Sequence, residues 1–123
     1  MSDPRTDRTD VVAELGLTPM TKIEVVVDGA DEHAVRDVFL GAGASGYTAL
    51  TGVSGFGHHG EHQGRLLFND RSSLSMLITV VPDDRVAAVV AGIRRLLDER
   101  RGVLFVTPTA VSRPDYFGAG DQA

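Results

Sequence analysis

The segment KIEVVVDGADEHAVRDVFLGAGASGYTAL (residues 22–50) predicts a strand, a helix and a second strand in that order. Its first seven residues are rich in β-branched side chains, which favour a buried strand. Asp31 then offers an N-cap, and apolar residues recur at the spacing of a helix. GAGASG (41–46) ends that helix, because glycine supplies its left-handed termination. The apolar positions of the helix are Ala34, Val35, Val38, Phe39 and Ala42.

The rest of the chain repeats this plan. A strand from Tyr47 to about Phe56 is followed by a third strand, SSLSMLITVV (72–81). After Pro82 a second helix is predicted, with acidic residues at its positive end and arginines at its negative end. VLFVT (103–107) is the fourth strand. The second helix has an apolar stripe of Val86, Val89, Val90, Ile93 and Leu97.

The order β-α-β-β-α-β predicts an α+β, ferredoxin-like domain, whose antiparallel sheet packs both helices on one face. The other face is also rich in Val, Ile and Leu, and we expect self-association to cover it. Residues 21–117 form this domain. Residues 1–20 are predicted to be a flexible extension, and residues 118–123 a disordered tail.

Composition excludes several classes of protein. The chain has 123 residues, a formal net charge of -5 and no cysteine. The charge argues against a nucleic-acid binder, and the missing cysteines leave a cytoplasmic location as the default. No apolar run approaches the ~20 residues needed to insert into a bilayer.

Three segments resemble PII signalling proteins: GYTALTGVSGFG (46–57), ITVVPDD (78–84) and GVLFV (102–106). The resemblance implies a homotrimer that binds an adenine nucleotide in clefts between subunits. It also implies that residues 57–72 form the T-loop, which engages a protein partner.

The departures from the nitrogen-regulatory pattern point to one branch of the family. His59 replaces a glutamine used for Mg-ATP and 2-oxoglutarate, residues 57–73 contain no tyrosine, and DERRG (98–102) shortens the B-loop. The chain therefore resembles the carboxysome-associated, bicarbonate-responsive PII-like branch. That branch implies ADP or AMP as ligand, with ATP and bicarbonate as further candidates, and a transporter or carboxysome-related partner in inorganic-carbon metabolism.

The resemblance also implies a set of nucleotide-binding residues. Glycines let backbone N–H groups approach phosphate oxygens, arginine supplies bidentate charge-assisted bonds, and a valine before the proline lines the base pocket. Arg100 or Arg101 replaces the lysine of the usual B-loop, and Arg113 comes from the C-terminal arm. The predicted residues are Thr48, Gly55, Phe56, Gly57, His58, Val80, Val81, Arg100, Arg101, Gly102 and Arg113.

HHGEHQG (58–64) leaves three interpretations open. His58, His59 and His62 with Glu61 are of the residue types that bind Zn, Cu or Ni, but a loop gives them no fixed geometry. Alternatively the loop is simply polar. In the third interpretation, His58 or His59 donates a hydrogen bond to a phosphate or bicarbonate.

No catalytic signature is present: the sequence has no Walker loop, Rossmann fingerprint or nucleophile motif. We therefore expect a non-enzymatic sensor. The alternative is a metal-responsive trimer, similar to CutA proteins, that senses through the three loop histidines.

Overall fold

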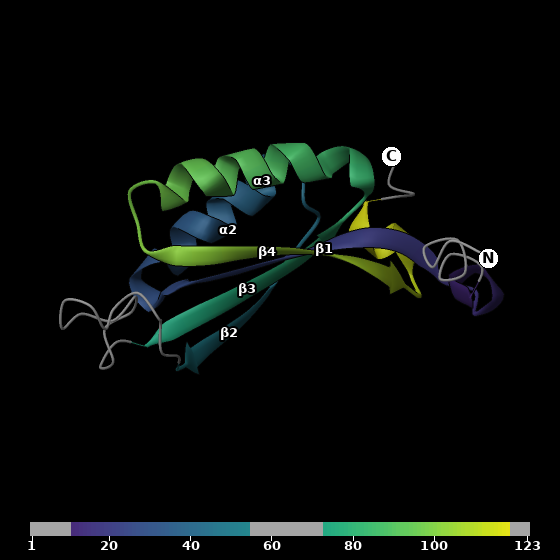
Figure 1. Cartoon of the computed structure of the whole chain (residues 1–123), viewed down its shortest axis with the longest axis horizontal. Helices are drawn as coiled ribbons and strands as arrows, with labels where there is room; N and C mark the ends of the chain where they lie inside the picture. The colour runs from purple at the N-terminus through teal and green to yellow at the C-terminus, as the bar shows by residue number, and fades with distance from the viewer. Residues whose placement is uncertain (1–10, 55–72, 119–123) are drawn as a thin grey trace, which may run out of the picture.

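The fold is known from a computed structural model, which describes residues 11–54 and 73–118. Its four strands form one antiparallel sheet in the order β2-β3-β1-β4 (Figure 1). The central strands are β1 (Thr18–Asp28) and β3 (Leu74–Val81), and the edges are β2 (Thr48–Val53) and β4 (Gly102–Val111). This arrangement confirms the predicted ferredoxin-like α+β fold.

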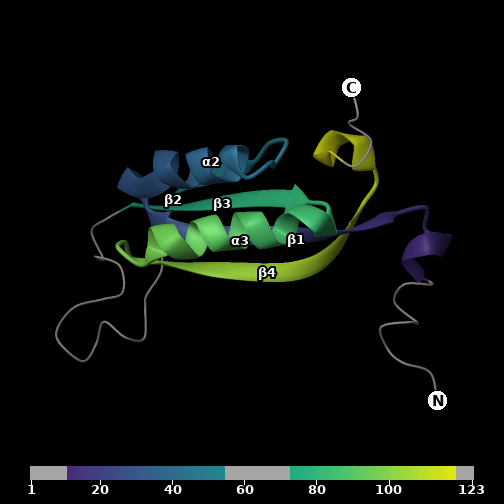
Figure 2. The same cartoon turned by 90° about the horizontal axis from the view of Figure 1, so that it is seen from above.

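Two helices, α2 (Glu32–Gly41) and α3 (Asp83–Leu97), lie side by side over the same face of the sheet (Figure 2). Their apolar stripes meet the helix-facing side chains of β1 and β3, as the 3.6-residue and two-residue periods require. Val35 and Phe39 of α2 and Val89 and Ile93 of α3 are fully buried. The buried core consists of Ile23, Val25, Val27, Val35, Phe39, Ala44, Leu77, Val81, Val89 and Ile93.

Two strands are longer than the sequence predicts. β1 begins at Thr18 rather than Lys22, and Met20 is only 3% exposed, so residues 18–20 are part of the sheet and not of an extension. β4 continues to Val111 and includes Pro108, opposite Thr21. Proline is tolerated there because β4 is an edge strand of the chain, where one row of ladder hydrogen bonds is absent anyway. Residues 11–14 form a helical turn before β1, and residues 1–10 lie outside the described part.

The C-terminal end of the described chain packs against the loop after α2. A short 3-10 helix, η3 (Pro114–Phe117), is fixed there by a 2.8 Å hydrogen bond from Ser45 Oγ to the carbonyl of Tyr116. Arg85 of α3 donates to the carbonyl of Gly43 at 2.6 Å, and its guanidinium also lies against Gly118. The sequence predicts a disordered tail from Gly118 onward, but Gly118 is buried, while residues 119–123 lie outside the described part.

Candidate nucleotide site

The predicted site residues lie at two opposite ends of the sheet. Gly102 opens β4 and pairs with Val27 at the far end of β1, whereas Arg113 follows the other end of β4. β4 has ten residues, so its ends are about 30 Å apart at the usual rise of a strand. A single chain cannot bring Gly102 and Arg113 to one ligand.

The first end carries the connection between α3 and β4, with Arg100, Arg101 and Gly102. The Nε of Arg100 lies 3.2 Å from Oδ1 of Asp31. Asp31 occupies the N-cap position of α2, as predicted, but its side chain makes no capping hydrogen bond. Its carboxylate pairs with Arg100 instead, which ties the connection after α3 to the start of α2.

Gly102 is closely packed within its own chain. A Cβ at this position would lie 2.8 Å from each of three atoms: the carbonyl oxygen of Val26, a methyl of Val27 and a methyl of Leu97. The family resemblance assigns this glycine to phosphate approach. The structure supplies a second and independent reason for it, since these neighbours leave no room for a side chain.

The second end carries Thr48, Val80 and Arg113. Thr48 is opposite Ile78 in the β2–β3 ladder, so Thr48 and Val80 are diagonal neighbours on the sheet face away from the helices. Val81 is 0% exposed and belongs to the core between sheet and helices. It therefore cannot line an accessible base pocket, which leaves Val80 as the candidate of the two.

Arg113 is held by Tyr116 at the exposed C-terminal turn. Its Nη1 donates to the Tyr116 hydroxyl at 2.7 Å, and its guanidinium carbon lies 5.3 Å from the centre of that ring. Hydrogen bonding and a cation–π contact thus orient a cation in solvent. Gly55, Phe56, Gly57 and the loop histidines His58, His59 and His62 lie outside the described residues.

Comparison with known proteins identifies the family. The model for nitrogen regulatory protein P-II matches residues 20–116. The chain belongs to the P-II family. Among curated protein sequences none matches this P-II chain.

Solved structures related to this P-II chain include the PII-like protein CPII from Thiomonas intermedia K12. CPII bound to ADP, AMP and acetate is 33% identical, with a TM-score of 0.71 over 82% of this chain and 96% of that chain. CPII bound to ADP and bicarbonate is 34% identical, with a TM-score of 0.68 and the same coverage. These matches confirm the resemblance to PII-like proteins and place the chain in the branch of the family that includes CPII.

A more distant structure agrees in fold. A PII-like signalling protein from Thermus thermophilus is 18% identical, with a TM-score of 0.64 over 82% of this chain and 97% of that chain. At this identity the match supports the architecture alone.

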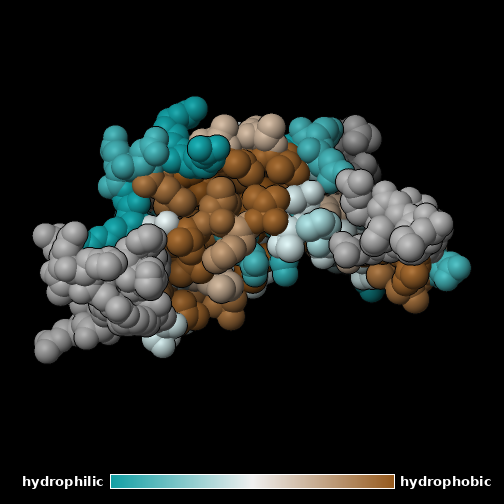
Figure 3. Space-filling model, viewed as in Figure 1, coloured by the Kyte–Doolittle hydropathy of each residue, from teal (hydrophilic) through white to brown (hydrophobic). Residues whose placement is uncertain are grey.

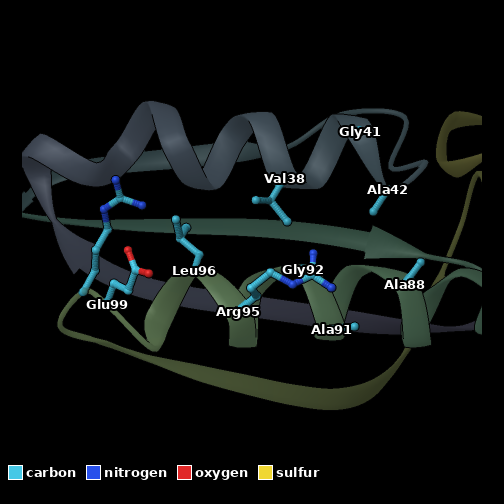
Figure 4. A pocket seen from close by; sticks show the side chains of 10 residues that line it. Val38, Gly41, Ala42, Ala88, Ala91, Gly92, Arg95, Leu96 and Glu99 are labelled. Carbon is cyan, nitrogen blue, oxygen red and sulfur yellow. The ribbon is translucent and has the colours of Figure 1, made fainter.

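One groove of this P-II chain is distinct from the predicted site. It has a volume of about 690 Å³ and lies between α2 and α3 on their outer side (Figure 4). Much of its lining consists of small residues, which allow α2 and α3 to pack closely. At Gly92, for example, a Cβ would lie 2.7 Å from a methyl of Val38. Of the predicted nucleotide-binding residues that the structure describes, only Arg100 lines this groove.

The metal alternative gains no support from the described part of this P-II chain. Within residues 11–54 and 73–118, no group of three or more His, Asp or Glu side chains is arranged to hold a metal ion. Over the same residues, no helix has the length and hydropathy to cross a bilayer.

The sequence missed two partners of site residues. It predicts only a capping role for Asp31, and no local pattern connects Asp31 with Arg100, from which it is separated by most of the domain. It also gives no prediction that the Tyr116 hydroxyl accepts a hydrogen bond from Arg113 in its own chain. The one sequence signal for this contact is that Arg113 and Tyr116 are three residues apart.

Proposed function

We propose that this P-II chain is a non-enzymatic regulatory protein that binds an adenine nucleotide, ADP or AMP, between the subunits of a homotrimer. ATP is a further candidate and bicarbonate an additional ligand. The observation that carries the proposal is the 33–34% identity, across 82% of the chain, to CPII structures that hold ADP together with AMP or bicarbonate.

The distance between the two ends of the sheet supports a site shared between subunits. One subunit contributes Arg100, Arg101 and Gly102, and its neighbour contributes Thr48, Val80 and Arg113. In this arrangement the neighbour's Arg113 binds phosphate oxygens as a planar, bidentate donor. Val80, next to Thr48 on the same sheet face, offers an apolar surface to the base.

Signalling is proposed to pass through residues 57–72, which lie outside the described residues, to a partner in inorganic-carbon metabolism. β2 ends at Val53, just before that segment, so Thr48 and the segment are joined by one short strand. The nucleotide can shift the segment between two states only if it binds them with different free energies.

Calorimetric titration with AMP, ADP and ATP, with and without bicarbonate, tests the proposal. Arg113→Ala should weaken ADP affinity about 10- to 100-fold, because hydrogen bonds to charged groups contribute about 1.5–3 kcal/mol. Arg94→Ala is the matched control, since Arg94 is exposed in the last turn of α3 and is not among the predicted nucleotide-binding residues. Absence of binding by any nucleotide at millimolar concentration would refute the proposal, as would equal affinities of the two variants.

Sedimentation velocity provides a second readout. The molar mass derived from sedimentation of the wild-type protein should be three times the 13.1 kDa mass of one chain. A monomer at every concentration would contradict a site that needs residues from two chains.

A further inference from the structure

The sheet face away from the helices is apolar and uncovered within the chain. Its members alternate with the core residues along each strand, and Figure 3 shows apolar surface gathered over the strands. Leu50 is 45% exposed and Phe105 is 51% exposed, which is far more than a core position allows. The apolar residues of this open face are Val26, Leu50, Met76, Ile78, Val80, Val103 and Phe105.

Two opposite charges lie in the middle of the open face. Lys22, the single lysine of the chain, and Glu24 are two residues apart on the central strand β1, so both side chains project from this face. Glu24 pairs across the sheet with Ile78 on one side and Phe105 on the other. The charges are therefore surrounded by apolar side chains.

Within one chain these two charges are poorly matched. The Nζ of Lys22 lies 3.9 Å from Oε2 of Glu24, which is longer than a hydrogen bond, and the side chains are 39% and 24% exposed. The ammonium has three donors and the carboxylate accepts several bonds, so both keep capacity for further partners. Covering the open face without new partners would leave both charges desolvated at considerable cost.

A second copy of the chain supplies the missing partners. The face carries one positive and one negative group side by side, so in a three-fold ring the ammonium of each subunit can meet the carboxylate of the next, and its carboxylate the ammonium of the one before. The proposed nucleotide site shared between subunits also requires a second copy, because Gly102 and Arg113 lie at opposite ends of β4. A partner with a single sign of charge would satisfy only one of the two groups.

We propose that Lys22 and Glu24 form ion pairs between subunits across the open face, and that these pairs fix the register in which copies of the chain associate. This inference rests on the proposed trimer and adds the residues that determine its specificity. Electrostatic complementarity of this kind mainly excludes wrong partners and wrong registers, whereas the apolar residues provide the burial.

The test uses charge reversal in two separate proteins, Lys22→Glu and Glu24→Lys. Each alone places like charges together and should raise the apparent dissociation constant of the assembly about 100-fold. Mixing these two variants should give only partial rescue, because a ring of three always leaves two subunits of the same sign in contact. The double variant, Lys22→Glu with Glu24→Lys, should associate with itself. Sedimentation and native mass spectrometry measure each case.

Mixing wild type with the double variant separates a contact between chains from a contact within one chain. Each protein should form its own trimers and no mixed ones, because like charges meet wherever the two kinds of subunit are neighbours. If the pair acted only within a chain, mixed trimers of wild type and double variant would form freely, and the inference would be wrong. Normal association of either single variant would also overturn it. If a reversed variant does not fold, as judged by circular dichroism, Lys22→Gln and Glu24→Gln take its place, each with an expected weakening of about 10-fold.

The chain offers a matched control on the opposite side of the molecule. Arg36 and Asp37 are 3.4 Å apart on α2, and Asp37 is 70% exposed. Arg36→Glu and Asp37→Arg should leave association unchanged. A monomeric wild-type protein would refute the proposed function itself, whereas a wild-type trimer with equally trimeric single variants would refute only this inference.

Discussion

Substitution of Gly102 by alanine separates the two explanations for this glycine. The added Cβ would meet a backbone carbonyl oxygen of β1 and two side-chain methyls, all at 2.8 Å. A carbonyl within a paired strand cannot move without disturbing the β1–β4 ladder, so the strain has no inexpensive release. Overpacking of this kind costs about 1–3 kcal/mol. We therefore expect Gly102→Ala to lower the free energy of unfolding by that amount, without any nucleotide present.

Urea unfolding at fixed protein concentration measures the effect, because the stability of an oligomer depends on concentration. Gly41→Ala is the matched control: it lies at the end of α2 and a Cβ there meets nothing within 4 Å. That control should be neutral or slightly stabilising, since alanine favours helix over glycine. Unchanged stability of Gly102→Ala, combined with lost ADP affinity, would refute the packing argument and leave phosphate approach as the reason for the glycine.

Contacts of named side chains support three further predictions. Asp31→Asn should strengthen ADP binding up to about 5-fold by calorimetry, because an exposed ion pair contributes at most about 1 kcal/mol and releasing Arg100 recovers it; weaker binding would mean that Asp31 instead orients Arg100. Phe39→Ala should lower the free energy of unfolding by about 3–5 kcal/mol in urea, since Phe39 is 0% exposed, whereas Leu40→Ala at a 47% exposed neighbour should change it by less than about 0.5 kcal/mol; equal effects would contradict the core assignment. Arg85→Ala should cost about 1–3 kcal/mol and accelerate proteolysis after η3, because the Gly43 carbonyl loses its 2.6 Å donor; Arg94→Ala is the control, and equal proteolysis of the two would refute the role of Arg85.

Hydrophobic periodicity was sufficient to predict the fold. The positions Val35 and Phe39, and likewise Val89 and Ile93, are four residues apart, and all four are fully buried. The errors fell at strand ends, where the local signals conflict with pairing. Pro19 and Pro108 suggest breaks, yet both lie in the β1–β4 ladder at positions with a partner strand on one side only, where proline is tolerated.

The candidate site was less predictable, because its geometry depends on contacts between distant segments. Nothing in the residues around Asp31 indicates an ion pair with Arg100, and a capping role was the reasonable local interpretation. The burial of Val81, by contrast, was open to prediction: β3 alternates, so of two consecutive valines only one can face the helices.

Two of the arginines proposed for the shared site, Arg100 and Arg113, have partners in their own chain, and the magnitudes indicate which contacts a nucleotide can replace. The Arg100–Asp31 pair is partly exposed, and such pairs contribute about 0–1 kcal/mol. The hydrogen bond of Arg113 to a neutral tyrosine hydroxyl contributes about 0.5–1.5 kcal/mol. A charge-assisted bond to a phosphate contributes about 1.5–3 kcal/mol, so a nucleotide gains by taking each arginine from its present partner. The existing contacts therefore compete only weakly with a nucleotide, by at most about 1 kcal/mol for Arg100 and about 1.5 kcal/mol for Arg113.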